Sequence, residues 1–406
     1  MKVKVLAGLI GACCGAPVFA QSNVTMYGIL DAGIQVSRFG NGTQTNLVSG
    51  IADGSRLGFK GMEDLGGGYR AIFNLEMRVE ADTGGNSPGY LVTPTQNVPL
   101  TEGLPAAVAA KLGPTILGAR VNSNNAAFDR QAYVGLVTPM GTISLGRQYS
   151  PSYEVAYKMD TFETGSAGAL ITGIMNGTGG IYTAAAAGRV NKSLQYRFQA
   201  RNGIGGSVMV GLAGDASTGS ANMSKRYWGT NVTYRADGLD VGAAYSTETD
   251  QNGKKSLTST TVGGSYTMGN ARLFAGYHRS KNDNTVLVPL MTPLIGAANA
   301  EIIGNNAKMN ADIYTVGMQY RIGAGRILGV VSHNNDKKAS NSDATLVALG
   351  YIYDLSKRTD VYTTVGHIAN KNHSQRTPGA AGYFSGFSSA PGQGATAYQF
   401  GVRHRF

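Results

Sequence analysis

The feature that most constrains this chain is the alternation of apolar and polar residues with a period of two. Between residues 69 and 82, Tyr, Ala, Phe, Leu, Met and Val alternate with Arg, Asn, Glu and Asp, and residues 23–37 and 189–201 repeat the pattern. A period of two places successive side chains on opposite faces of a β-strand. These segments therefore predict strands with one apolar and one charged face.

The chain lacks the apolar segments of a helical membrane protein. Beyond the first twenty residues, no apolar run reaches the ~18 residues that a membrane-spanning helix needs. The best candidate, residues 104–119, is interrupted by Pro105, Lys111 and Pro114. Charged residues make up only 15% of the chain, which is the opposite of the composition of a disordered protein.

The first twenty residues predict a cleaved signal peptide. Lys2 and Lys4 precede an apolar run at 5–12, and Val18 and Ala20 occupy the small-residue positions of a cleavage site. A lipoprotein signal with Cys13 as the modified residue is the alternative. With residues 1–20 removed, residues 21–406 form a single domain without cysteine, so we expect neither disulfides nor thiol catalysis.

The number of strands and the lengths of their connections define the fold class. Sixteen strands are predicted, near 24–38, 52–63, 69–82, 127–137, 142–149, 189–201, 207–214, 226–235, 239–249, 256–267, 271–280, 311–321, 326–334, 344–354, 359–370 and 395–406. Short Gly-rich turns alternate with long loops near 83–126, 150–188, 281–310 and 371–394. This sorting is typical of outer-membrane barrels. We predict an all-β fold, a 16-stranded antiparallel transmembrane β-barrel.

Six segments in order resemble the general trimeric porins of Gram-negative outer membranes, most closely their β-proteobacterial branch. They are MYGILDAG (26–33), SRLGFKG (55–61), EDLGGG (63–68), RQAYVGL (130–136), LGRQY (145–149) and RHRF (403–406). The resemblance implies an outer-membrane location in contact with lipid, a homotrimer, and a third long loop folded into each pore as a constriction loop. The chain ends on an aromatic residue without a tail, and we interpret Phe406 as an assembly signal.

The basic side of the predicted constriction follows from the same resemblance. It implies a cluster of wall arginines, which matches Arg56, Arg130 and Arg189 in this sequence. Alternation agrees for Arg56 and Arg189, because their apolar neighbours take the lipid-facing positions. A second set of basic residues is expected on lumen faces or rims: Lys60, Arg70, Arg78 and Arg147.

The acidic side is expected on the infolded loop, about residues 150–188. Asp160 and Glu163 are assigned to the constriction, with Glu154 in reserve. The segment DTFETG at 160–165 departs from many relatives, which carry Pro before the Phe. The pairing of each acid with a wall arginine therefore stays open.

The predicted function is a water-filled channel for passive diffusion of small hydrophilic solutes and ions. Removal of Lys2 and Lys4 with the signal peptide takes the net charge from +11 to +9 (11 − 2 = 9). This charge and a basic lumen favour anions, since rings of Arg or Lys attract them. Glu76, Glu80 and Asp82 oppose this preference. The alternative is a substrate-specific channel of the same fold for a particular anionic solute. A surface adhesin or receptor that uses the loops at 83–126 and 371–394 is a further alternative, compatible with transport. The other interpretation of the loop at 83–126 is that it braces a neighbouring subunit.

Other functions have little support in the sequence. Residues 85–89 fit a G-x-S-x-G pattern, but Pro88 has no N–H to donate to an oxyanion. The five histidines lack metal-ligand spacing, and no phosphate-binding glycine motif occurs. Basic residues are spread along alternating strands, which argues against nucleic-acid binding. We therefore expect no enzyme activity, no cofactor, no metal and no nucleic-acid partner.

Overall fold

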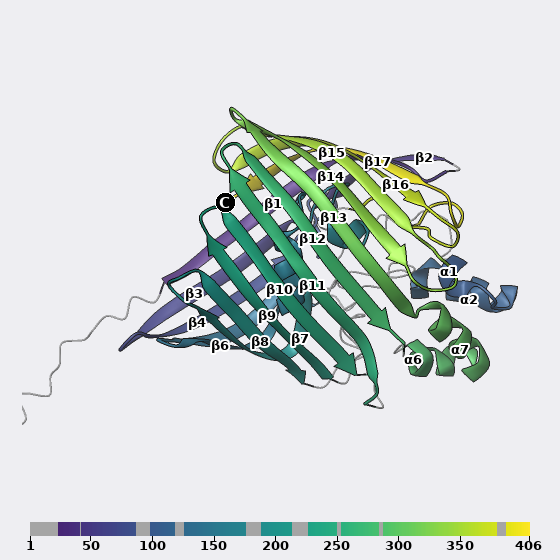
Figure 1. Ribbon diagram of the computed structural model, residues 1–406, viewed down its shortest axis with the longest axis horizontal. Coiled ribbons are helices and arrows are strands. Elements are labelled where there is room, and N and C mark those ends of the chain that lie inside the picture. The colour runs from purple at the N-terminus through teal and green to yellow at the C-terminus, as the bar shows by residue number, and fades with distance from the viewer. Residues whose placement is uncertain are drawn as a thin grey trace, which may run out of the picture.

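The computed structural model describes residues 23–40, 42–86, 98–117, 126–175, 188–212, 226–249, 253–283, 287–379 and 387–406. The predicted signal peptide lies outside these ranges. The described strands form one antiparallel sheet that closes on itself as a barrel (Figure 1). No helix in these ranges is long and apolar enough to cross a bilayer.

The wall is built from strands that run up and down in sequence order. They are β1 (Asn23–Arg38), β2 (Thr43–Ser49), β3 (Arg56–Gly66), β4 (Tyr69–Arg78), β5 (Gln131–Thr138), β6 (Gly141–Tyr149), β7 (Arg189–Gln199), β8 (Ile204–Leu212), β9 (Arg226–Ala236), β10 (Leu239–Thr249), β11 (Lys255–Met268), β12 (Ala271–Asn282), β13 (Met309–Ile322), β14 (Gly325–Asp336), β15 (Ala344–Asp354), β16 (Thr359–Asn370) and β17 (Ala395–Arg405).

These strands fill sixteen positions around the barrel, because β2 and β3 share one. The second half of β1 pairs with β2 and its first half pairs with β3. Closure comes from β1 and β17, whose register runs from Ile29 opposite Arg405 to Arg38 opposite Thr396. Phe406 extends this seam by exchanging two backbone hydrogen bonds with Gly28, each 3.1 Å long. The prediction of a sixteen-stranded barrel is confirmed, although the separate strand β2 was not predicted.

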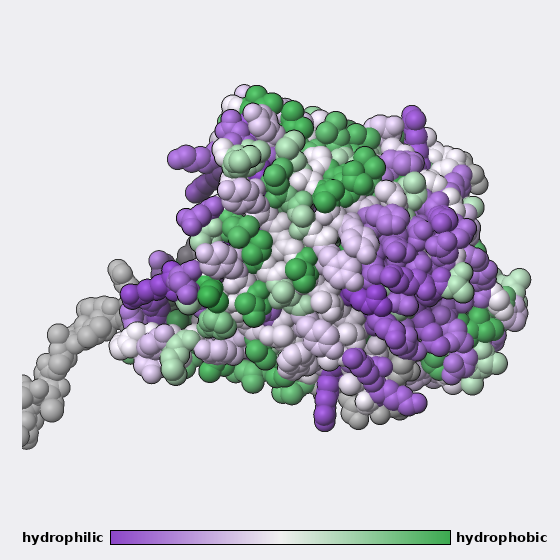
Figure 2. Space-filling view, viewed as in Figure 1, coloured by the Kyte–Doolittle hydropathy of each residue, from purple (hydrophilic) through white to green (hydrophobic). Residues whose placement is uncertain are grey.

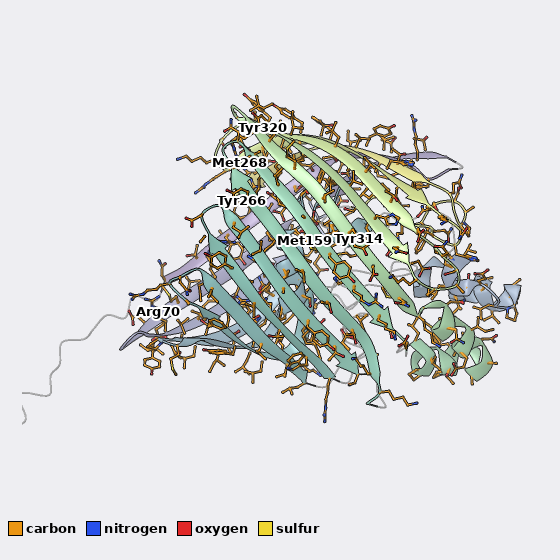
Figure 3. All side chains as sticks on the ribbon, viewed as in Figure 1. Arg70, Met159, Tyr266, Met268, Tyr314 and Tyr320 are labelled. Atoms are coloured by element: carbon orange, nitrogen blue, oxygen red, sulfur yellow. The ribbon has the colours of Figure 1, made fainter. Side chains whose placement is uncertain are left out.

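The barrel turns its apolar face outward. Val134 and Val316 on the outer face are 56% and 60% exposed, whereas Asn231 and Ser332 on the inner face are buried. In Figure 2 hydrophobic residues lie over the strands, and hydrophilic residues gather toward one end. Tyr266, Tyr314 and Tyr320 stand outward from the wall (Figure 3). An apolar band with aromatic residues at its borders is the surface that a bilayer requires.

The two ends of the barrel differ. Short connections, such as 67–68, 237–238 and 323–324, lie at one end, which we call the turn end. At the other end, the loop end, the described residues form the helices α1 (Val98–Thr101), α2 (Ala106–Leu117), α6 (Leu287–Ile295) and α7 (Ala297–Asn306) (Figure 1). Leu100 and Leu112 bury their side chains against Leu287, Met291 and Ile303. Leu100 and Leu112 of the loop between β4 and β5 are thus covered by the same chain, whereas Val98 of this loop is 37% exposed.

The loop between β6 and β7, which is the predicted constriction loop, folds into the barrel as α3 (Pro151–Lys158) and α4 (Leu170–Gly173). Ser150 caps α3 by accepting a hydrogen bond from the Tyr153 N–H, and Pro151 occupies the first turn, where its missing N–H costs nothing. Further along, Leu170 and Ile174 pack with Leu346 and Ile368 of the wall. The main apolar cluster of the molecule therefore joins this constriction loop to β13–β16.

Glycines in the wall leave room for the constriction loop to pack directly against the strands. A Cβ atom added at Gly242 would lie 3.0 Å from Val155, and Cβ atoms at Gly276 and Gly317 would collide with Met159 and Thr161. In Figure 3 Met159 lies behind β11 and β12. Because any larger residue would occupy the space of the loop, these glycines allow the loop to lie directly against the strands.

We expect Gly366→Val to displace the constriction loop from β16. A Cβ atom there would lie 2.5 Å from the Ala167 carbonyl oxygen, and backbone cannot move aside as a flexible side chain can. Overpacking of this kind costs about 1–3 kcal/mol. The measurement is single-channel conductance, which should rise. Gly329→Val is the matched control, since a Cβ atom at Gly329 has nothing within 4 Å. Equal conductance in the two variants would contradict the prediction.

Candidate functional site

The three predicted wall arginines come together around Glu76 and Tyr149. The Arg130 Nε donates to Glu76 Oε1 at 2.7 Å, and Arg56 Nη1 lies 4.0 Å from Glu76 Oε2. The Tyr149 hydroxyl accepts from Arg130 at 3.3 Å and from Arg189 at 2.8 Å. These five residues form what we call the wall cluster. Arg56 also pairs with Asp53.

Aromatic stacking connects the wall cluster to the constriction loop. The Arg189 guanidinium lies 4.6 Å from the centre of the Tyr149 ring, within the range of a cation–π contact. On the loop, Tyr153 stacks on Tyr149 with ring centres 4.8 Å apart. The loop thus begins in direct contact with the cationic part of the wall. The side chains of Arg56 and Arg130 are only 15% and 6% exposed, so Arg130 supports the cluster more than it faces water.

A β-bulge changes which residues at the start of β7 face the inside of the barrel. Strands β6 and β7 shift register between Gly146 and Gln148, and Lys192 has a positive φ of 49°. A bulge reverses the alternation of side chains on one side of it. Val190, and not Arg189, consequently packs inside with Met209. The alternation argument for Arg189 is therefore wrong, although Arg189 still reaches Tyr149.

The secondary basic residues divide into two groups. Arg78 is buried between Asp129 and Glu80, at 3.3 and 3.2 Å, and Arg147 donates to the Asp129 carbonyl at 2.6 Å. Both lie close to the wall cluster. Lys60 and Arg70 are exposed toward the turn end, and Figure 3 places Arg70 at that rim. Burial raises the pKa of Glu80 to about 7, although the charge of Arg78 opposes this shift. Glu80 therefore opposes the anion preference less than the sequence analysis expected.

The structure corrects the role predicted for Asp160. Its side chain is not turned toward the wall arginines: Asp160 is 1% exposed, and its carboxylate accepts from the N–H groups of Phe162 at 2.9 Å and Leu170 at 3.0 Å. Burial raises the pKa of Asp160 to about 7, although these hydrogen bonds oppose the shift. Asp160 therefore holds two parts of the constriction loop together.

Glu163 and Glu154 pair with arginines other than the three predicted. The Glu163 carboxylate accepts from both terminal nitrogens of Arg326, at 3.0 and 3.4 Å, and burial is outweighed by this guanidinium, so the pKa of Glu163 is lowered. Glu154 pairs with Arg197 and accepts from Asn231 at 3.0 Å, while burial raises its pKa. Each acid thus secures the loop to the nearest strands.

Several residues of the inner wall and the wall cluster were not predicted as site residues. Arg326 is the second residue of β14, and Arg403 lies in β17, where it binds Asp360 at 3.1 Å. Their outward neighbours Ile327 and Val402 show the alternation that would have placed both arginines on the inner face. Tyr149 carries no charge, so a search for charged residues alone missed its position between two arginines.

A closed barrel with an apolar outside, a polar inner wall and an infolded loop defines a membrane channel of the β-barrel class. A family model of the Gram-negative porins matches residues 5–373. Over the full length of both chains, the sequence is 27% identical to outer membrane porin protein 32 of Delftia acidovorans. It is 24% identical to the major outer membrane protein P.IB of Neisseria meningitidis serogroup B, again with 100% of both chains covered.

Solved structures agree on the fold. The anion-selective porin from Comamonas acidovorans matches with a TM-score of 0.70 at 24% identity, over 95% of this chain and 100% of that chain. The chain belongs to the Gram-negative porin family, and it is an outer-membrane porin.

Proposed function

We propose that the channel allows passive diffusion of small hydrophilic solutes and ions, and that it prefers anions. The observation that carries this proposal is the wall cluster, where Arg56 and Arg130 pair with one glutamate and Arg189 binds the hydroxyl of Tyr149. The loop acids are engaged elsewhere, since Glu163 pairs with Arg326 and Glu154 with Arg197. Excess positive charge in a narrow lumen raises the local concentration of anions. The anion-selective relative with the same fold supports the proposal.

Ion selectivity of the purified protein tests this proposal. A planar bilayer that contains single channels separates two KCl solutions of different concentration. The reversal potential of the channel current is then measured. We expect it to take the sign of the chloride equilibrium potential, and to approach zero as salt is raised, because the Debye length falls from about 10 Å at 0.1 M to about 3 Å at 1 M. A reversal potential with the sign of potassium would refute the anion preference.

The family match also supports a proposal about export and assembly. We propose that residues 1–20 are removed, that Phe406 acts as an assembly signal, and that three copies form a homotrimer. Support comes from the family match, and from Phe406 closing the seam at Gly28. Mass spectrometry of the mature protein tests the cleavage site. Chemical crosslinking in mild detergent tests the number of subunits.

A further inference from the structure

A compact group of polar and charged side chains lies on the outer face of the barrel, near the loop end. One oxygen of Asp312 in β13 accepts from Arg279 of β12 at 2.6 Å, and the other contacts the Lys337 ammonium at 2.8 Å. Arg279 also donates to Asn310 Oδ1 at 3.2 Å. Lys337 follows β14 and continues the ladder by donating its N–H to the Asn310 carbonyl at 2.7 Å. We call these four residues the rim cluster.

The alternation of the strands places the rim cluster on the side of the barrel that faces lipid. Asp312 shares a face of β13 with Tyr314 and Val316, and both of these are exposed. Arg279 shares a face of β12 with Leu273, which is also exposed. Figure 3 shows Tyr314 turned outward from the wall. The rim cluster is therefore separate from the lumen and from the wall cluster.

A pair of tyrosines marks the border between the apolar band and the rim cluster. Tyr277 and Tyr314 lie opposite one another on β12 and β13, with ring centres 5.4 Å apart. The Tyr277 hydroxyl donates to Asp312 at 2.9 Å. Tyrosine at a membrane border has its ring against the apolar region and its hydroxyl toward the headgroups. Arg279 and Asp312, which lie nearer the loop end than these tyrosines, are thus at the level of the lipid headgroups.

The rim cluster presents positive charge to its surroundings. One carboxylate, that of Asp312, serves both Arg279 and Lys337. Its side chain is 5% exposed, whereas those of Arg279 and Lys337 are 38% and 42% exposed. A guanidinium has five N–H donors and an ammonium three, so the contacts with Asp312 and Asn310 use only part of them. The remaining donors belong to the two exposed cations, which makes this surface suited to an anion.

The position of the rim cluster indicates the anion. The loop end is the extracellular end, because porin-type barrels have short periplasmic turns and longer extracellular loops. In a Gram-negative outer membrane, the lipid of that leaflet is a glycolipid with phosphate monoesters on its glucosamine sugars. A phosphate monoester carries a charge of about −1.5 to −2 and three acceptor oxygens. A planar guanidinium beside an ammonium matches this group in charge and geometry.

We propose that Arg279 and Lys337 bind a phosphate monoester of an outer-leaflet glycolipid. The acyl chains of this lipid lie against the apolar band below Tyr277 and Tyr314. Asp312 holds the two cations side by side, so that one phosphate can contact both. The binding surface lies outside the lumen, and it therefore does not depend on the anion preference proposed for the channel.

Native mass spectrometry of the full-length mature protein tests the site, with diphosphoryl lipid A as the probe. The protein is refolded in detergent without lipid, so that no bacterial glycolipid is carried over. We expect saturable binding of lipid A and about tenfold weaker binding of phosphatidylglycerol, because a phosphodiester has less charge and one acceptor oxygen fewer.

The variant Arg279→Gln/Asp312→Asn/Lys337→Gln should bind lipid A about tenfold more weakly than the unaltered protein. It removes the buried acid together with its two cations, so that no buried carboxylate is left unpaired. Lys357→Gln is the matched control, since it also lowers the net charge by one, at an exposed position in the turn after β15. Unheated samples should migrate as folded barrels on gels.

Three results would overturn the proposal: no saturable binding of lipid A, equal affinity for lipid A and phosphatidylglycerol, or equal affinity for lipid A in the triple variant and the Lys357→Gln protein. If the triple variant does not fold, Arg279→Gln replaces it, because Lys337 then still pairs with Asp312. The same comparison with Lys357→Gln applies to that variant.

Discussion

Replacing Arg56 and Arg189 together by glutamine is expected to lower the chloride-to-potassium permeability ratio about tenfold. A unit charge about 8 Å from a passing ion changes the energy of that ion by about 0.5 kcal/mol in water. Removing the charge disfavours chloride and favours potassium, so each substitution changes the ratio by about fivefold before screening. Arg130 is left in place because it is the partner of the buried Glu76, and an unpaired buried carboxylate destabilises the wall.

The measurement is the reversal potential in a KCl gradient. The double variant Lys357→Gln/Arg358→Gln is the matched control, since it also removes two positive charges, from exposed positions in a turn-end connection. Unheated samples should migrate as folded barrels on gels in every variant, so that a change in selectivity reports charge and not misfolding. An unchanged ratio in the double variant would show that the wall cluster does not set selectivity.

The barrel could be predicted from sequence because each strand separates two solvents. Lipid outside and water inside impose opposite polarity on alternate residues, and this period survives without any knowledge of the partner strand. The bounds of β10 and β15 agree with the prediction at both ends. Strand β2 was missed, because its sequence TQTNLVS carries apolar residues only near its end. Its pairing depends on the length of β1, which no local pattern reveals.

The site was less predictable than the wall, because a loop takes its partners from distant parts of the chain. The resemblance and the alternation identified the wall arginines, whereas the bulge at Lys192 reversed the alternation around Arg189. Glu163 meets Arg326, which is 163 residues away in sequence. Asp160 turns back on its own loop. None of these outcomes follows from charge or spacing alone.

Asp160→Ala is expected to release the constriction loop. The substitution leaves the buried N–H groups of Phe162 and Leu170 without their acceptor, and each unsatisfied donor costs about 1–3 kcal/mol. Segments 160–162 and 170–174 would then no longer be held together by hydrogen bonds to one carboxylate. We expect the loop to detach from the wall more often as a result. Single-channel recordings should show larger and noisier open-state currents than those of the unaltered protein.

The same carboxyl group should make the loop sensitive to pH. The pKa of Asp160 is about 7 while the loop is packed against the wall, which we call the seated state. The ordinary value of 3.8 applies once the loop is released into water. The seated state therefore binds more protons between about pH 4 and pH 7, so its stability falls as pH rises through that window and levels off above it. Open-state noise should increase from pH 5 to pH 8.

Asp160→Asn separates the charge from the hydrogen bonds. It keeps one acceptor for a backbone N–H and removes the ionisable group, so we expect less noise than in Asp160→Ala and no change in noise from pH 5 to pH 8. If the asparagine variant kept the full pH response, the titrating group would lie elsewhere, with Glu80 as the next candidate because its pKa is also about 7. If the alanine variant conducted like the unaltered channel, the apolar packing of Leu170 and Ile174 against β15 and β16 would be sufficient to hold the loop.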